Sequence, residues 1–137
     1  MTKQISVFLE NISGRLADVT RILAARGINL RALTIADTAD FGILRIIVDD
    51  TEKAVAVLAN EGFTVKLTDV LAVEVPDSPG GLAEVMELFR TKEVNIEYLY
   101  SSLEKNSSKA AIILKVENLE HGLKIVRENH LSVVAQL

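Results

Sequence analysis

Two short stretches of the sequence place glycine at a predicted helix start, next to polar side chains. They are ENISGRLADV at residues 10–19 and PDSPGGLAEV at residues 76–85. The first turn of a helix has backbone N–H groups without intrahelical partners and carries partial positive charge, so it suits a carboxylate. Gly14, Gly80 and Gly81 have no β-carbon, which lets a ligand approach these N–H groups. Each stretch can therefore bind an anion.

Polar side chains at matching positions add a second kind of contact. Asn11 and Asp77 are 66 residues apart, and a side-chain oxygen at either position can accept a hydrogen bond from an α-ammonium group. The same two residues and Ser13 are also ordinary helix-capping residues, and glycine and proline are ordinary turn residues. From the residues alone, helix capping is the favoured explanation and an amino-acid site is the alternative. We call residues 10–16 the first corner and residues 76–82 the second corner.

The elements that position the two corners repeat as well. Apolar residues recur at the strand period of two before each corner, at Ile5, Val7 and Leu9 and again at Leu71, Val73 and Val75. After each corner they recur at helical spacing, at Leu16, Val19, Ile22 and Leu23 and again at Leu82, Val85, Leu88 and Phe89. Gly27 suits a left-handed helix end, whereas its counterpart Glu93 predicts a weaker stop.

The remaining elements follow in the same order in both halves. Second strands are predicted at 30–37 and 96–102, third strands at 42–48 and 110–116, second helices at 50–62 and 117–130, and last strands at 63–67 and 131–137. The offset grows to 68 at the third strands, which places two extra residues in the second hairpin, around KNSS at 105–108.

Each half therefore has the order strand, helix, strand, strand, helix, strand. This order predicts an α+β fold of two tandem ferredoxin-like domains, each an antiparallel sheet with two helices on one face. We expect the domains to span residues 1–69 and 70–137, joined only by Thr68 and Asp69 between two separate strands.

Apolar residues also alternate onto the opposite face of each predicted sheet. They are Phe8, Ile43 and Ile47 in the first half and Val70, Ala72, Ile113 and Val134 in the second. A face this apolar is seldom left in water, so we expect a cover. The sister half or a second copy of the chain, giving a homodimer, is the favoured cover. A ligand or another protein is the alternative.

Composition excludes several classes of protein. The 137 residues include no cysteine, and the longest apolar run, residues 54–59, is far shorter than the roughly 18 to 20 residues that span a bilayer. The first residues have no signal-peptide pattern, so we expect a soluble cytoplasmic protein without a membrane partner. A net charge of −4 with scattered basic residues, and third strands without aromatic residues, argue against a nucleic-acid partner.

The sequence offers little for catalysis. His121 and His130 are the only histidines and are far in sequence from both corners, so we expect them at the surface. Neither a nucleophile elbow nor a phosphate loop occurs, and the carboxylates are dispersed. We therefore expect no enzyme, no catalytic residue, no metal site and no cofactor.

At the two corners the sequence resembles the ACT domain family. The first half carries NISGRL and then GINL, and the second carries DSPGGL and then VNI. Ser13 stands where the family commonly has proline, and Glu93 replaces the glycine before the second strand. The resemblance covers essentially the whole chain as a tandem pair, and it reverses the preference for helix capping at the corners.

The resemblance implies a regulatory module. ACT domains bind amino acids or similar effectors, usually where two such domains meet, and some are attached to enzymes such as phosphoglycerate dehydrogenase and aspartate kinase. We therefore expect a stand-alone allosteric regulator that binds a free amino acid and alters a partner enzyme. The alternative is a non-catalytic subunit that docks on an enzyme of amino-acid metabolism without binding a ligand.

The expected ligand-binding residues come from the corners and from the starts of the second strands. They are Asn11, Ile12, Ser13, Gly14, Arg15, Leu16, Asn29, Leu30, Asp77, Ser78, Pro79, Gly80, Gly81, Leu82, Asn95, Ile96 and Tyr98. Tyr98 lies with Tyr100 on the outward face of its strand, where it is either a pocket wall or interface packing. Asn29 and Asn95 are expected mainly to hold turn backbone.

Overall fold

The order of helices and strands repeats once along the chain. The computed structural model describes residues 1–37, 40–103, 108–134 and 137. Its elements are β1 Thr2–Glu10, α1 Arg15–Ala25, β2 Leu30–Asp37, β3 Phe41–Val48, α2 Thr51–Asn60, β4 Thr64–Pro76, α3 Gly81–Thr91, β5 Ile96–Ser101, β6 Lys109–Val116 and α4 Leu119–Glu128. Two compact units result, an N-terminal unit of residues 3–68 and a C-terminal unit of residues 69–137 with residues 1–2.

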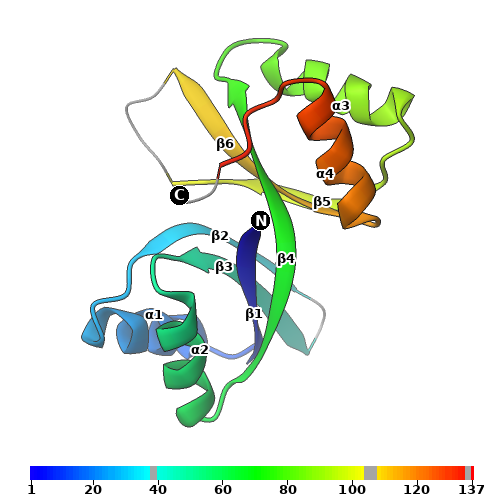
Figure 1. The fold of residues 1–137 in the computed structure, drawn as a ribbon. Helices are drawn as coiled ribbons and strands as arrows, with labels where there is room; N and C mark the ends of the chain where they lie inside the picture. The colour runs from blue at the N-terminus through cyan, green and yellow to red at the C-terminus, as the bar shows by residue number, and fades with distance from the viewer. Residues whose placement is uncertain (38–39, 104–107, 135–136) are drawn as a thin grey trace. The chain divides into compact units, whose positions relative to one another are not determined.

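The N-terminal unit is built on the strand order β2-β3-β1-β4. β3 pairs antiparallel with both β1 and β2, so that Ile46 stands opposite Ile5 on one side and Leu33 on the other. Both helices pack on the same face of these strands, and Figure 1 shows α1 and α2 side by side there. The core consists of alternate strand residues together with Val19, Leu23, Ala54 and Leu58 from the helices.

The C-terminal unit repeats this arrangement with the order β4-β6-β5. β6 pairs antiparallel with both neighbours, and Leu114 stands opposite Leu71 and Leu99. In the described part of the predicted last strand, residues 131–134 make a short contact with β4, where Val133 bridges to Val73 and the N–H of Val134 donates to Ala72 O at 2.7 Å. The expected KNSS insertion lies mostly outside the described residues. The 68-residue offset after it is confirmed, because Asp50 and Asn118 cap matching helices.

One prediction about the strands is wrong. The last strand of the first half and the first strand of the second half were expected as separate strands joined by Thr68 and Asp69. The structure has a single strand of 13 residues, β4, that runs through both positions. Neither glycine nor proline occurs in it before Pro76, so nothing in the local sequence interrupts the extended backbone. The predicted tandem ferredoxin-like α+β fold is otherwise confirmed.

The outer faces of the strands are only partly exposed. Val70, Ala72 and Ile113 are completely buried although they belong to neither helix-covered core. Phe8, in contrast, keeps 41% of its surface exposed. No helix within the described ranges is long and apolar enough to cross a membrane.

The four helices end in the same way, each followed by a residue in the left-handed conformation. In the N-terminal unit these residues are glycines, Gly27 at φ 69° and Gly62 at φ 90°. In the C-terminal unit the equivalent residues are Glu93 and His130, both at φ 57°. Glu93 still forms the expected helix-end bonds, since its N–H donates to Arg90 O at 3.2 Å. The helix stop is thus fully formed despite the missing glycine.

We expect Glu93→Gly and His130→Gly each to raise the free energy of unfolding by about 0.5 to 1 kcal/mol. A residue with a β-carbon costs roughly 1 to 2 kcal/mol in the left-handed region, partly offset by the greater freedom of glycine in the unfolded chain. Urea denaturation measures the change. As matched controls, Gly27→Ala and Gly62→Ala should lower stability without a clash, because an added β-carbon meets nothing within 4 Å at either position. Unchanged stability in Glu93→Gly and His130→Gly would show that the left-handed conformation of these residues costs no free energy.

Candidate functional site

The first corner presents a helix start that no side chain caps. Gly14 is the residue before α1, in the left-handed conformation at φ 91°, and it makes no side-chain cap. The carbonyl of Gly14 accepts from the N–H of Asp18 at 2.9 Å, which closes the first helical turn. Within the described residues, the N–H groups of Leu16 and Ala17 have no acceptor. Two donors of the first turn are therefore available to a ligand.

The second corner has the same geometry. Gly80 precedes α3 at φ 89°, again without a side-chain cap, and its carbonyl accepts from the N–H of Glu84 at 3.0 Å. The N–H groups of Leu82 and Ala83 have no acceptor in the described part of the chain. Both corners thus share a left-handed glycine followed by two free donors, as expected for an anion-binding helix start.

The other two helices are capped in the ordinary way, which makes the corners stand out. The side chain of Asp50 accepts from the N–H of Lys53 at 3.2 Å, and Asn118 accepts from the N–H of His121 at 3.0 Å. Helix capping by Asn11, Ser13 or Asp77, the explanation favoured by the residues alone, is therefore wrong. A left-handed glycine occupies the capping position instead, so these side chains start one or more residues too early to cap.

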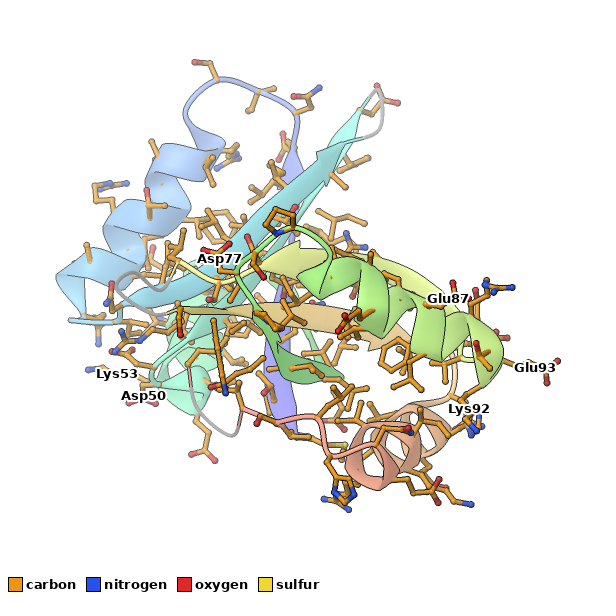
Figure 2. All side chains as sticks on the ribbon, turned by 90° about the horizontal axis from the view of Figure 1, so that it is seen from above. Asp50, Lys53, Asp77, Glu87, Lys92 and Glu93 are labelled. Atoms are coloured by element: carbon orange, nitrogen blue, oxygen red, sulfur yellow. The ribbon has the colours of Figure 1, made fainter. Side chains whose placement is uncertain are left out.

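Backbone hydrogen bonds hold each corner against the neighbouring hairpin. The N–H of Asn11 donates to Asp40 O at 3.1 Å, and the N–H of Asp77 donates to Ser108 O at 2.9 Å. Figure 2 shows Asp77 on the segment that leads into α3. Both residues are exposed. The corners are consequently fixed at their first residue, while the side chains of Asn11 and Asp77 remain accessible.

The two corners differ at the last residue of the strand and the first residue of the helix. In the first corner, Arg15 Nη2 lies 3.3 Å from Glu10 Oε1. In the second corner the equivalent residues are Gly81 and Pro76, and a β-carbon on Gly81 would lie 2.1 Å from Pro76 O. The first corner therefore has a partly exposed ion pair at the positions where the second corner has a close contact between Gly81 and the backbone of Pro76.

The starts of the second strands lie at the opposite end of the helices from the corners. The N–H of Asn29 donates to Asp49 Oδ1 at 3.0 Å, and Asn95 Nδ2 donates to Glu117 Oε2 at 3.2 Å, so both asparagines hold turns. Leu30 and Ile96 pack against the two cores. Tyr98 stands opposite Lys115, about 20 Å along β6 from Lys109 beside the second corner. None of these residues joins the corner of its own unit.

Equivalent side chains also support the far ends of α1 and α3. Lys53 Nζ donates to Arg26 O at 2.8 Å, and His121 Nε2 lies 2.9 Å from Lys92 O at the matching position. Figure 2 shows Lys92 and Glu93 at the end of α3 remote from Asp77. His121 thus has a structural role. No group of three or more His, Asp or Glu side chains in the described ranges is arranged to hold a metal ion.

The one clear change in acidity along α3 is also remote from the corner. Arg90 Nε donates to Glu87 Oε2 at 3.1 Å on the exposed side of the helix, and this hydrogen bond lowers the pKa of the Glu87 carboxyl. Both side chains are exposed, and the pair is typical of helix residues three apart. It contributes to the surface of α3 and places no charge at the second corner.

A cleft next to the first corner was not foreseen from the sequence. It has a volume of about 280 Å³ and lies where β1 ends and β3 and β4 begin. Its main lining residues are Phe8, Glu10, Arg15, Phe41, Glu61 and Phe63. We call it the phenylalanine cleft. Of this set only Arg15 was expected to bind a ligand, because strand pairing, and not spacing in the sequence, brings Phe41 opposite Glu10.

We expect Gly81→Ala to lower the free energy of unfolding by about 1 to 3 kcal/mol, since the new methyl group cannot be accommodated without moving the backbone of Pro76. Arg15→Ala is the matched control at the equivalent position of the first corner. It removes a partly exposed ion pair and should change stability by less than about 1 kcal/mol. Urea denaturation of both variants measures the difference, and equal effects would show that the two corners are packed alike.

Comparison with known proteins agrees with this fold. The sequence profile of the ACT domain pair family matches residues 1–137. Among solved structures, protein BT0572 from Bacteroides thetaiotaomicron is similar, with 42% identity, a TM-score of 0.91 and coverage of 97% of this chain and 91% of that chain. No match was found among curated proteins.

Two more distant structures share the fold. The regulatory subunit of aspartate kinase from Thermus thermophilus, in its ligand-free form, has 20% identity and a TM-score of 0.67, over 92% of this chain and 90% of that chain. Aspartate kinase from Synechocystis has 17% identity and a TM-score of 0.60, over 94% of this chain but only 24% of that chain. Since the family profile spans the full sequence, the resemblance seen at the corners is confirmed, and the chain belongs to the ACT domain pair family.

Proposed function

We propose that this ACT domain pair is a regulatory protein that binds a free amino acid at its corners. The observation that carries the proposal is the contrast between the helices. α1 and α3 begin at left-handed glycines without a cap, whereas α2 and α4 are capped by Asp50 and Asn118. α2 and α4 show that a side chain can cap a helix in this fold. Because no side chain caps α1 or α3, the N–H groups of their first turns can donate to a ligand.

An amino acid matches the groups that each corner presents. Its carboxylate can accept from the two free N–H groups of the first turn, where the helix dipole favours negative charge. Its ammonium group can donate to the exposed oxygen of Asp77 in the second corner, or to that of Asn11 in the first. These contacts recognise the part common to all amino acids, and so they leave the side chain to be selected by the surroundings.

Thermal unfolding of the purified chain in the presence of each of the twenty amino acids, at millimolar concentration, tests this proposal. A ligand present at 100 times its Kd stabilises by about 2.7 kcal/mol. The melting temperature should then rise by roughly 5 to 15 °C for a chain of this size. The absence of a shift with all twenty would contradict amino-acid binding.

A matched pair of variants can identify the occupied corner. Ala17 and Ala83 are the exposed third residues of α1 and α3, and each contributes one of the free N–H groups. Proline is tolerated in the first turn, so Ala17→Pro and Ala83→Pro each delete one donor and keep the helix. The variant at an occupied corner should lose most of the ligand-induced melting shift. Ala17→Gly and Ala83→Gly keep the donor and should preserve the shift, which separates donor loss from helix weakening.

A docking subunit is the second candidate function. It is supported by the likeness in fold to the aspartate kinase regulatory subunit of Thermus thermophilus, a protein that by name serves an enzyme. In this case the chain acts on an enzyme of amino-acid metabolism without a ligand of its own, and the corners have no effector role. Catalysis by the chain itself is not part of either proposal.

Self-association stays a prediction. Its basis in the sequence was the apolar outer face of the strands, but Val70, Ala72 and Ile113 are already buried and do not require a second copy. Among the predicted outer-face residues, Phe8, at 41% exposed, and the half-buried Ile43 and Val134 remain to support it. Sedimentation at micromolar concentration would show a dimer if the prediction is correct.

A further inference from the structure

The phenylalanine cleft exposes aromatic surface that the fold itself does not require. Phe8 and Phe41 retain 41% and 55% of their surface in water. Phe63 contributes a partly buried wall that also packs against the core of the N-terminal unit. Two exposed phenylalanines beside one small cleft represent apolar surface that a ligand can cover with a gain in free energy.

The C-terminal unit provides an internal comparison for these residues. Strand register makes Glu74 the equivalent of Phe8 and Lys109 the equivalent of Phe41. In the C-terminal unit these two residues form an ion pair, with 3.6 Å between Lys109 Nζ and Glu74 Oε2. The same backbone frame therefore accepts ordinary charged surface residues at both positions. The phenylalanines of the N-terminal unit are thus not needed for the fold.

Charged groups of both signs lie at the edge of the cleft. Arg15 points one guanidinium nitrogen at Glu10, at 3.3 Å, and another at Asp18, at 3.7 Å. Its Nε is buried and has no hydrogen-bond partner among the described residues. A buried donor of this kind is normally satisfied, so it suits an acceptor supplied by a ligand. Glu10 and Glu61 add carboxylates that can accept from an ammonium group.

We infer that the phenylalanine cleft selects amino acids with a large apolar side chain, of the leucine and phenylalanine class. The side chain packs against Phe8, Phe41 and Phe63. Arg15 Nε, and not the free N–H groups of the first turn, then donates to the carboxylate, and the acidic edge, and not Asn11, accepts from the ammonium group. This inference rests on the proposed function and adds two things to it: the class of effector, and the N-terminal unit as the place where it binds. The volume of about 280 Å³ is slightly below the roughly 300 to 1,000 Å³ of clefts that bind drug-sized ligands, as suits a single amino acid, which is a smaller molecule.

The test replaces two phenylalanines of the cleft with the charged residues that the C-terminal unit has at the equivalent positions. The double variant Phe8→Glu/Phe41→Lys installs the ion pair that the C-terminal unit already carries, so the chain should fold. Calorimetric titration with L-phenylalanine and L-leucine, with L-serine for comparison, should show binding of the two apolar amino acids to the unmodified chain and at least a tenfold higher Kd for the double variant. Glu74→Gln/Lys109→Gln, at the equivalent positions, should leave Kd unchanged. Circular dichroism and urea denaturation confirm the fold of each variant, and Phe41→Lys alone serves if the double variant is unstable.

The outcomes separate this inference from the proposed function. Equal binding of L-phenylalanine and L-leucine to the unmodified chain and the double variant would overturn the cleft as the selecting site but retain an amino-acid effector. Binding of L-serine in preference to both apolar amino acids would overturn the side-chain class in the same way. Failure of all twenty amino acids to shift the melting temperature would overturn the proposed function itself, and the inference with it. L-phenylalaninamide, which has no carboxylate, should bind at least tenfold more weakly than L-phenylalanine, and equal affinity would overturn the role of Arg15 Nε.

Discussion

β4 is the constraint on which the rest of the chain depends, because one uninterrupted strand serves both halves of the repeat. Its first residues belong to the N-terminal unit and its later residues to the C-terminal unit. Its end at Pro76 leads directly into the second corner, as the end of β1 at Glu10 leads into the first. The end of β4 therefore sets where α3 begins, as the end of β1 does for α1, and a left-handed glycine stands directly before each of these helices.

The repeat separates what the frame requires from what each unit has added. Features present in both units, such as the left-handed glycine before α1 and α3 and the support that Lys53 and His121 give to the preceding helix end, belong to the frame. Features present in only one unit are free to serve a particular purpose. The first corner has Glu10 and Arg15, both lining the phenylalanine cleft, where the second has Pro76 and Gly81 in close backbone contact.

Much of this organisation could be predicted from the sequence, since the apolar periods of two and of about four report directly on strands and helices. The repeat order, the cores and the existence of the corners were predicted on that basis. The continuity of β4 was not, because Thr68 and Asp69 suit a link as well as a strand. The left-handed conformation of Gly14 was also not predicted. It places Gly14, and not Ser13, directly before α1, so Ser13 does not cap the helix. The cleft depends on strand register, which joins Phe41 to Glu10 across 31 positions of sequence.

The difference between the two corners has a consequence for how the inferred binding depends on the concentration of the amino acid. Both corners have free donors, and the phenylalanine cleft lies beside the first, so the inferred apolar side chain would find its matching surface in the N-terminal unit of each chain. Binding at the cleft alone, as inferred, would saturate at one molecule per chain, and a single chain would then follow a simple hyperbolic curve with a Hill coefficient of about 1. A regulator with one such site would report the level of its effector gradually, over roughly two decades of concentration, and would not switch at a threshold.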